Sequence, residues 1–434
     1  MPRRLDVTDP GFAQDFEQLV WAKREQVADV DDQVRAILDA VRLRGDAAVT
    51  EYTKKFDRLD LLPTGMRVTT EEIGAAGSKC TSEALDALTL AAERIESFHR
   101  RQMPEDEFYE DSSGVGLGWR WTALKAVGLY VPGGSAAYPS SVLMNAIPAK
   151  VAGVERLAMV VPSPDGVLNP HVLAAASIAG VDEIYRVGGA QAVGALAYGT
   201  ATIERVDKIV GPGNAYVASA KKLVFGVVGI DMIAGPSEVL IVADAGNNPD
   251  WIAVDLLAQA EHDEAAQAIL ITDDAAFGDA VVDAVNRQLE TLDRKDIAAA
   301  SWKSHGAVIR VRDFSEAPAL VDSLAPEHLE VALENADLFA QSVRNAGAIF
   351  LGRYTPEAIG DYVGGSNHVL PTDRSARFSS GLSVLEFLKR TSLLRCNAES
   401  LSAIGPAAVT LARAEGLDAH ARSVAIRLNI GRDD

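Results

Sequence analysis

Short apolar runs alternate with glycine-rich turns and alanine-rich helical segments from about residue 120 onward. This alternation is typical of βαβ units, in which helices connect neighbouring strands of a mostly parallel sheet. At 434 residues the chain also exceeds one ordinary hydrophobic core, so we expect two or more domains. The predicted strands cover 157–161, 183–187, 207–210, 238–243, 268–272, 307–311 and 348–351. The predicted helices cover 169–179, 190–198, 214–224, 250–262, 276–289 and 334–345.

The two ends of the chain have helical rather than alternating patterns. Residues 31–56 carry apolar side chains at helical spacing, and Gly45 is expected to separate two helices there. Residues 82–102 predict another long amphipathic helix. After about residue 381, the segments SVLEFLKR and PAAVTLARAEGLDAHARSVAIRL both favour helix.

Composition excludes several classes of function. The net charge of −20 leaves no basic stripe for a nucleic acid or for an anionic membrane surface. Neither a run of about 18 apolar residues nor the apolar segment of a secretory signal occurs in the sequence. Cys80 and Cys396 lie far apart and outside any CxxC pattern, which disfavours a disulfide framework or a thiolate zinc site. We therefore expect a reduced, cytoplasmic protein.

Gln259 and His262 form the strongest candidate pair of metal ligands. They are three residues apart and share one face of the predicted helix 250–262. An imidazole and an amide oxygen in this arrangement can reach one cation. The alternative is a polar helix end, QAEHDE, that faces water.

Two further segments supply candidate ligands. Asp361 and His368 lie in the glycine-rich segment IGDYVGGSNHVLP, where glycines permit close approach to a ligand; the alternative is a surface turn. His420 lies in AEGLDAHARS with Glu415 five residues before it, and on its own it is more typical of a surface histidine. A site without cysteine has only nitrogen and oxygen ligands, which suits Zn²⁺ and also Mn²⁺ or Co²⁺.

An adjacent acid and base occur in the segment 322–331, DSLAPEHLEV. Pro326 is expected at the first position of a helix, which places Glu327 and His328 in its first turn. Such a pair offers one base for water and one for an alcohol. Adjacent helical side chains diverge by about 100°, so they would contact two parts of one substrate. The alternative is helix capping by Glu327 beside a solvated histidine.

Three glycine-rich turns in the middle of the chain suit a nucleotide. They are GLYVPGG at 128–134, RVGGAQAVGALAYGT after the strand 183–187, and KIVGPGNAYVASAKK after the strand 207–210. A strand, a glycine turn and a helix together present backbone N–H groups to a pyrophosphate. None of the three is a GxGxxG motif, so ordinary tight turns are the alternative.

Taken in order, these motifs resemble the histidinol dehydrogenase family across essentially the whole chain. The specific matches are AGPSEVLIVAD followed by LLAQAEHD, then LAPEHLE, GDYVGGSNHVLPT and EGLDAHARS; VGLYVPGG, GGAQAVGALAYGT and VGPGNAYVASAKK are softer matches. The resemblance implies two successive NAD-dependent oxidations, from L-histidinol through an aldehyde to L-histidine. This reaction is the last step of histidine biosynthesis.

The resemblance also implies a role for each matching residue. One Zn²⁺ per subunit would be bound by Gln259, His262, Asp361 and His420. The substrate would be held by Ser237, Gln259, His262, His328, Asp361, His368, Glu415 and His420. Catalysis would depend on Glu327 and His328, and NAD would contact Tyr130, Gln191 and Asn214.

The fold that the resemblance implies has two incomplete Rossmann-like α/β domains with mostly parallel sheets, and small helical extensions at both ends. The first domain would combine 25–129 with 239–380 and carry the metal and acid–base residues. The second domain would span 130–238 and bind NAD. Residues 1–24 would form an extension ahead of the first domain. The helical tail 381–434 would cross over in a homodimer, so that Glu415 and His420 enter the site of the partner chain.

Two other functions account for part of these patterns. A zinc-dependent hydrolase of a small polar substrate would use Glu327 to activate a metal-bound water, but it leaves the glycine-rich middle of the chain unused. A two-lobed solute-binding protein would have similar alternation of strands and helices. Such proteins are usually exported, and the acid–base pair would then have no purpose.

Overall fold

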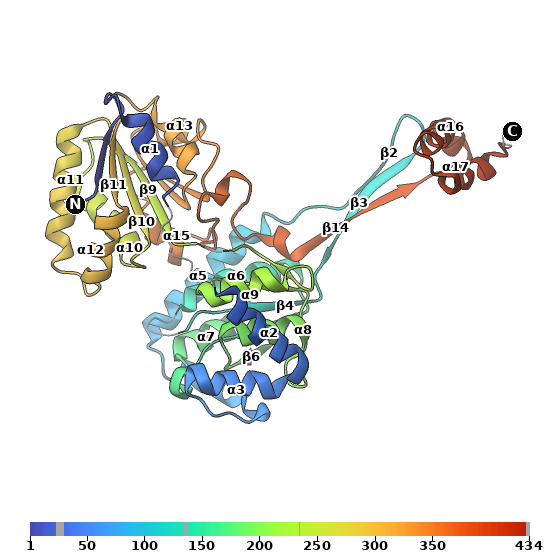
Figure 1. Ribbon diagram of the computed structural model, residues 1–434, viewed down its shortest axis with the longest axis horizontal. Coiled ribbons are helices and arrows are strands. Elements are labelled where there is room, and N and C mark those ends of the chain that lie inside the picture. Colours follow the sequence, from blue (N-terminus) through green and yellow to red (C-terminus); the bar gives the residue numbers. More distant parts are fainter. Residues whose placement is uncertain (23–29, 134–137, 234, 431–434) are drawn as a thin grey trace. The chain divides into compact units, whose positions relative to one another are not determined.

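The computed structural model describes residues 1–22, 30–133, 138–233 and 235–430 (Figure 1). The chain forms two compact units: the first contains Met1–Gln102 and Lys125–Phe387, and the second contains Met103–Leu124 and Leu388–Asp434. Gly134 of a predicted turn, Ala234 of the AGPSEV motif, 25–29 of the predicted first domain and 431–434 of the predicted tail lie outside the described residues. Among the residues that are described, no helix is both long and apolar enough to cross a membrane.

A six-stranded sheet in the first unit consists of parallel neighbours only. Its spatial order is β1 (Arg3–Asp6), β11 (Ala307–Arg310), β10 (Gln267–Thr272), β9 (Glu238–Ala243), β12 (His328–Ala332) and β13 (Ala348–Leu351). Along β9, Val239 and Ile241 enter one core while Leu240 and Val242 enter another, because side chains of a strand alternate between the two faces. Helices α10 (Pro249–Ala260), α11 (Ala275–Leu289) and α12 (Lys295–His305) contribute to the first core. Helices α1 (Phe12–Val20), α13 (Ala317–Leu324) and α14 (Ala336–Ala340) contribute to the second, so both faces of the sheet are covered.

A five-stranded sheet in the same unit is also parallel throughout. Its spatial order is β6 (Glu183–Tyr185), β5 (Arg156–Val160), β4 (Ala126–Tyr130), β7 (Lys208–Val210) and β8 (Gly229–Ile230). Helices α2 (Asp31–Arg44), α3 (Asp46–Asp57), α8 (Gly189–Tyr198) and α9 (Ala215–Val224) share one core with this sheet. Four more helices pack against one another beside it: α4 (Thr70–Gly77), α5 (Ser82–Arg100), α6 (Pro139–Ala152) and α7 (Pro170–Ile178).

The order of the five strands creates a switch point between β4 and β7. From β4 the chain continues to β5 and β6 on one side, and only then returns to β7 and β8 on the other. Ligands of open α/β sheets bind at such a point, outside the carboxyl ends of the strands. Tyr130 ends β4 and Gly211 follows β7, so the glycine-rich turns predicted from the sequence lie at this edge.

The second unit is a smaller structure of a different kind. Its strands β14 (Leu388–Arg395), β3 (Gly116–Ala123) and β2 (Glu107–Glu110) form an antiparallel sheet in that order. Helices α16 (Ala398–Ala414) and α17 (Asp418–Ala425) follow β14 and pack on each other around Val409, Ala421 and Ala425.

The mixed α/β fold with mostly parallel sheets is confirmed, and all seven predicted strands are present with shifts of a residue or two at their ends. The break at Gly45 between two helices is also confirmed. The predicted helix 334–345 is reduced to Ala336–Ala340.

Two local predictions are wrong. Pro326 does not begin a helix: α13 ends at Leu324, Ala325 adopts a left-handed conformation with φ of 46°, and His328 is the first residue of β12. The residue before a proline rarely adopts the backbone angles of an α-helix. Pro326 therefore follows the end of a helix and does not begin one. The segment SVLEFLKR is a short 3₁₀ turn at Val384–Phe387 followed by strand β14, whose pairing with β3 joins residues far apart in sequence.

The structure also divides the chain differently from the predicted domains. Helices α2 and α3 share the core of the five-stranded sheet, and β4 is one of its strands, whereas 25–129 were expected with 239–380. Strand β1, from the predicted N-terminal extension, is an edge strand of the six-stranded sheet. The predicted helical tail shares its unit with β2 and β3.

Candidate active site

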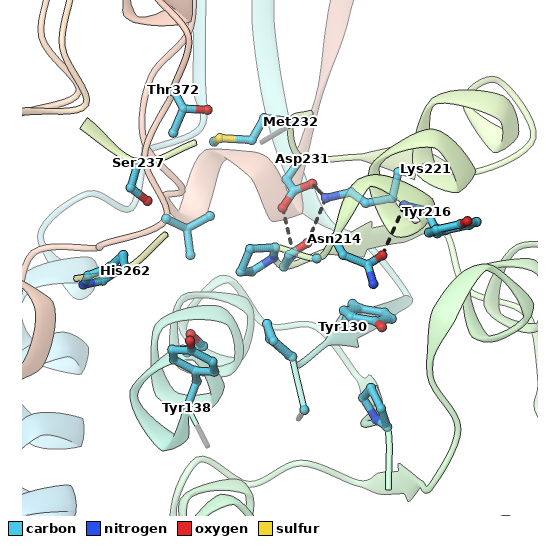
Figure 2. Close-up of a pocket in the computed structure, with 18 of the residues that line it drawn as sticks. Tyr130, Tyr138, Asn214, Tyr216, Lys221, Asp231, Met232, Ser237, His262 and Thr372 are labelled. Carbon is cyan, nitrogen blue, oxygen red and sulfur yellow. Dashed lines mark hydrogen bonds and ion pairs between the residues drawn. The ribbon is translucent and has the colours of Figure 1, made fainter. Parts of the chain in front are cut away.

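A cavity of about 780 Å³ in the first unit is lined by elements of both parallel sheets (Figure 2). It brings together residues that lie far apart in the sequence, from Ile37 to Thr372. The predicted site residues on its wall are Tyr130, Gln191, Asn214, Ser237, His262, Glu327, His328, Asp361 and His368. The cavity is therefore the candidate active site.

The predicted acid–base residues lie at the amino edge of the six-stranded sheet. Ser237 immediately precedes β9, Glu327 immediately precedes β12, and these two strands are parallel neighbours, with His328 paired to Val239. His262 follows the end of α10. At the opposite, carboxyl edge, Asn247 donates from Nδ2 to the carbonyl oxygen of Ala332 at 2.8 Å and ties the ends of these strands together.

Glu238 holds both members of the acid–base pair. Its backbone N–H donates to Oε2 of Glu327 at 3.0 Å, and its own Oε2 accepts the backbone N–H of Glu327 at 3.2 Å. Its carbonyl oxygen lies 2.9 Å from Nδ1 of His328. All three residues are buried, so this reciprocal arrangement restricts both side chains to one orientation.

His328 has the form of a neutral base. Because a carbonyl oxygen only accepts hydrogen bonds, Nδ1 carries the proton and Nε2 keeps its lone pair. Nε2 is buried with no hydrogen-bond partner within the described ranges, and it lies 3.9 Å from Oδ1 of Asp361. Burial lowers the pKa of His328 to about 4, against the opposing charge of Asp361, so the ring is neutral at pH 7.

Asp361 connects the two histidines on this side of the cavity. It lies on α15 (Glu357–Tyr362), and its Oδ1 is 4.0 Å from Nδ1 of His368. That Nδ1 is 3.0 Å from the Asp361 carbonyl oxygen, while Nε2 of His368 is 3.4 Å from Oγ of Ser141. Burial is the main cause that lowers the pKa of His368, so it too is held as a neutral ring.

Gln259 is buried beside His328 and does not line the cavity. One end of its side-chain amide lies 3.2 Å from Oε1 of Glu357, 3.2 Å from Nδ1 of His328 and 3.3 Å from the carbonyl oxygen of Glu238. Burial raises the pKa of Glu357 well above its usual value, and the charges of Asp361 and Glu330 add to this rise. Gln259 thus links the acidic interior of α15 to the base at His328.

Glu415 and His420 belong to the second unit, where Glu415 follows the end of α16 and His420 lies on α17. Both side chains are exposed. In the ranges that the structure describes, no three His, Cys, Asp or Glu side chains are gathered closely enough to hold a metal. Of the four predicted ligands, His262 and Asp361 line the cavity, Gln259 is buried beside it, and His420 lies in the other unit.

The cofactor residues predicted from the sequence lie at the carboxyl edge of the five-stranded sheet. The hydroxyl of Tyr130 accepts the N–H of Gly189 at 3.0 Å, at the beginning of α8. Oδ1 of Asn214 accepts the N–H groups of residues 216 and 217 and caps α9. Gly211 has φ of +109°, and a Cβ there would lie 2.1 Å from the Tyr130 carbonyl oxygen, so only glycine permits this approach.

An ion pair that the sequence analysis missed supports the turn at Gly211. Nζ of Lys221 donates to the Gly211 carbonyl at 2.9 Å, and Oδ2 of Asp231 accepts the Gly211 N–H at 2.7 Å. Lys221 and Asp231 also pair with each other, and their side chains are 3% and 1% exposed (Figure 2). No sequence signal separates Lys221 from its exposed neighbour Lys222, because both end the same helix.

Comparison with known proteins shows the family of the chain. A family model described as histidinol dehydrogenase matches residues 21–428. The chain is 65% identical to a histidinol dehydrogenase of Rhizobium meliloti (strain 1021), covering 100% of both, and 65% identical to one of Brucella melitensis, covering 99% of this chain and 100% of the relative. A solved histidinol dehydrogenase from Elizabethkingia anophelis superposes with a TM-score of 0.94 at 37% identity, over 99% of this chain and 98% of that one. The chain therefore belongs to the histidinol dehydrogenase family.

Proposed function

We propose that this protein oxidises L-histidinol to L-histidine in two successive NAD⁺-dependent steps, through L-histidinal, as the last step of histidine biosynthesis. The observation that carries the proposal is the shared cavity. His328, a buried neutral imidazole whose Nε2 has no partner among the described residues, lines this cavity. The switch point between β4 and β7 opens into the same cavity. A base for an alcohol and a place for a dinucleotide thus meet at one site. Relatives that carry the name of a dehydrogenase give no support to the hydrolase alternative.

The residues at the switch point fit NAD⁺. The turn from Gly211 to Asn214 and the beginning of α8 at Gly189 line the cavity, and each follows a strand and leads into a helix, which is the arrangement that receives a pyrophosphate. Tyr130 and the buried pair behind Gly211 hold both turns in place. We propose that Tyr130, Gln191 and Asn214 contact the bound dinucleotide.

The residues at the other end of the cavity fit Zn²⁺. His262 and Asp361 line it, Asp361 faces the buried Nε2 of His328, and the set contains only nitrogen and oxygen donors. We propose that Gln259, His262, Asp361 and His420 hold the ion. When bound, it would supply a Lewis acid that orients the imidazole and amino groups of the substrate without taking part in electron transfer.

Ser237, His368 and Glu415 complete the proposed substrate site. Ser237 and His368 line the cavity, and we propose that Glu415 reaches it together with His420 from a second chain. His328 then takes the hydroxyl proton at Nε2 while the carbinol carbon loses hydride to the first NAD⁺. The aldehyde adds water that Glu327 deprotonates, and His328 takes the hydroxyl proton of this hydrate as a second NAD⁺ accepts hydride. Two NADH and three protons are released for each histidine, which leaves as the carboxylate, with one water consumed.

A thiolate route for the aldehyde step has no support from the positions of the cysteines. Cys80 lies between α4 and α5, and Cys396 is exposed in the second unit. Neither lines the cavity. Water is therefore the proposed nucleophile. Glu327 and Glu357 both lie 3.8 Å from Nδ1 of His328, and of these two carboxylates Glu327 lines the cavity.

Glu327→Gln separates the two half-reactions. Because only the aldehyde needs an added water, the variant should oxidise L-histidinal more slowly by about 10²-fold while losing much less in L-histidinol oxidation. NADH formation from each substrate, followed separately in single-turnover experiments, measures both steps. An equal loss in the two steps would contradict the water-activating role. A wild-type protein that oxidises neither substrate would contradict the proposed function itself.

We also propose a cytoplasmic homodimer in which the second unit of each chain completes the site of the other. The second unit has a small core and exposes Leu394, Leu411 and Ile426, which an exchanged unit would cover. A mixture of inactive His262→Ala and His420→Ala proteins should then regain part of the wild-type activity, since one site of each mixed dimer keeps all its ligands. Subunit exchange proven by mass spectrometry without any recovered activity would contradict shared sites.

A further inference from the structure

Two buried acceptor atoms in the cavity wall have no partner within the described ranges. One is Oδ2 of Asp57 and the other is Oε1 of Gln191, and both residues line the cavity. Asp57 ends helix α3 and is only 8% exposed. Native folds rarely leave such groups unpaired, so unpaired acceptors in a binding cavity indicate a ligand that brings donors.

We propose that Asp57 binds the adenosine ribose of the cofactor and thereby selects NAD⁺ over NADP⁺. This inference rests on the proposed function, because it assumes a nicotinamide dinucleotide in the cavity. It adds a residue that determines specificity on the side of the cavity opposite to the reacting groups.

The location of Asp57 follows from which elements line each part of the cavity. His262, Glu327 and His328 come from the six-stranded sheet and its helices, and the nicotinamide must lie beside them to accept hydride. Asp57 and its neighbours on the wall, Ile37, Phe56, Pro162 and Pro164, come from helices and turns around the five-stranded sheet. With the pyrophosphate at the Gly211 turn between them, the adenosine half extends to this apolar wall.

The charge near Tyr130 supports the same placement. Asp57 and Tyr130 line the same cavity. Burial raises the pKa of Tyr130 to about 12, and the charge of Asp57 adds to that rise. A carboxylate accepts hydrogen bonds from both hydroxyls of a ribose. A 2′-phosphate offers a charge of about −1.5 to −2 and only acceptor oxygens, which this carboxylate repels.

The neighbouring cation does not favour a phosphate either. Enzymes that use NADP commonly present an arginine to the 2′-phosphate. Arg58 follows Asp57, but its Nε and Nη2 both donate to the carboxylate of Asp165, with 2.8 Å from Nε to Oδ1. The guanidinium is thus already neutralised by a partner of its own.

Equilibrium binding of NAD⁺ and NADP⁺ to the zinc-loaded dimer, measured by calorimetry, tests this assignment. Wild-type protein should bind NAD⁺ more tightly. Asp57→Asn, which keeps the shape and removes the charge, should reduce the ratio of the two affinities by about tenfold or more, as expected for the loss of one charged hydrogen bond. Asp60→Asn, an exposed acid paired with Lys54, is the matched control and should leave the ratio unchanged.

Two further comparisons make the test decisive. AMP and adenosine 2′,5′-bisphosphate differ by the same 2′-phosphate as NAD⁺ and NADP⁺, but they have no nicotinamide. The ratio of their affinities should shift in the same direction in Asp57→Asn and in Asp57→Ser. A variant that weakens both dinucleotides equally, with the ratio kept, would overturn the assignment and leave Asp57 as a structural residue. Wild-type protein that binds neither dinucleotide would overturn the proposed function together with this inference.

Discussion

His328→Asn is expected to lower kcat for L-histidinol oxidation by about 10²- to 10⁴-fold, the range of a general base. The reason is the lone pair that His328 keeps at Nε2. Nδ1 of His328 is committed to the Glu238 carbonyl at 2.9 Å, so Nε2 is the atom left to take the hydroxyl proton. Asparagine can keep a hydrogen bond to that carbonyl but has no basic nitrogen.

Both half-reactions should be affected by this substitution, because the alcohol and the hydrated aldehyde each lose a hydroxyl proton. Steady-state rates with L-histidinol and with L-histidinal measure the two effects, and zinc content confirms that the metal is retained. His171→Asn, on helix α7 outside the cavity, is the control and should keep wild-type rates. A rate for His328→Asn within a factor of three of the wild type would contradict its role as the base.

Lys221→Met is expected to destabilise the folded protein by about 3–5 kcal/mol, the usual effect of removing one member of a buried ion pair. The variant leaves Asp231 charged in a site where its side chain is 1% exposed. It also removes the donor to the Gly211 carbonyl, so the turn that carries Asn214 loses support on one side. Adding Asp231→Asn should recover part of the loss, because it removes the uncompensated charge.

Lys222→Met provides the matched comparison for this prediction. Lys222 is adjacent in the same helix but is 58% exposed, and its partner Asp31 is also partly exposed. Exposed pairs contribute little to stability, so this variant should unfold close to the wild-type temperature. Thermal unfolding followed by circular dichroism compares the variants. Equal midpoints for Lys221→Met and Lys222→Met would show that the buried pair does not hold the turn.

The parallel strands could be predicted because a strand that is buried on both faces is a short, nearly continuous run of apolar residues in the sequence. β9 and β10 are short and almost wholly apolar, and glycine-rich turns or alanine-rich helices flank them. β12 does not form such an apolar run, because two of its first three residues, His328 and Glu330, are titratable. Proline and glutamate ahead of it resembled the beginning of a helix. In the structure, burial and pairing with β9 override that local pattern.

The candidate site was predictable where a residue has distinctive chemistry or a distinctive motif. His262, His328 and His368 were found in this way, and all three line the cavity. Asp57 and Lys221 were missed because a single acid or lysine at the end of a helix is ordinary in sequence. Their significance depends on burial, and burial here is created by segments that lie far away along the chain. Glu238 did leave a signal, as a charged residue at the beginning of an apolar strand.

Counting NADH per histidinol decides whether this protein carries out a four-electron oxidation that depends on zinc. Purified protein is given a limiting, known amount of L-histidinol with excess NAD⁺, before chelation, after chelation and after zinc is restored. We predict two NADH and one L-histidine per L-histidinol, no NADH after chelation, and recovery of NADH formation with zinc. One NADH with release of the aldehyde, or two NADH with the metal fully removed, would contradict this prediction.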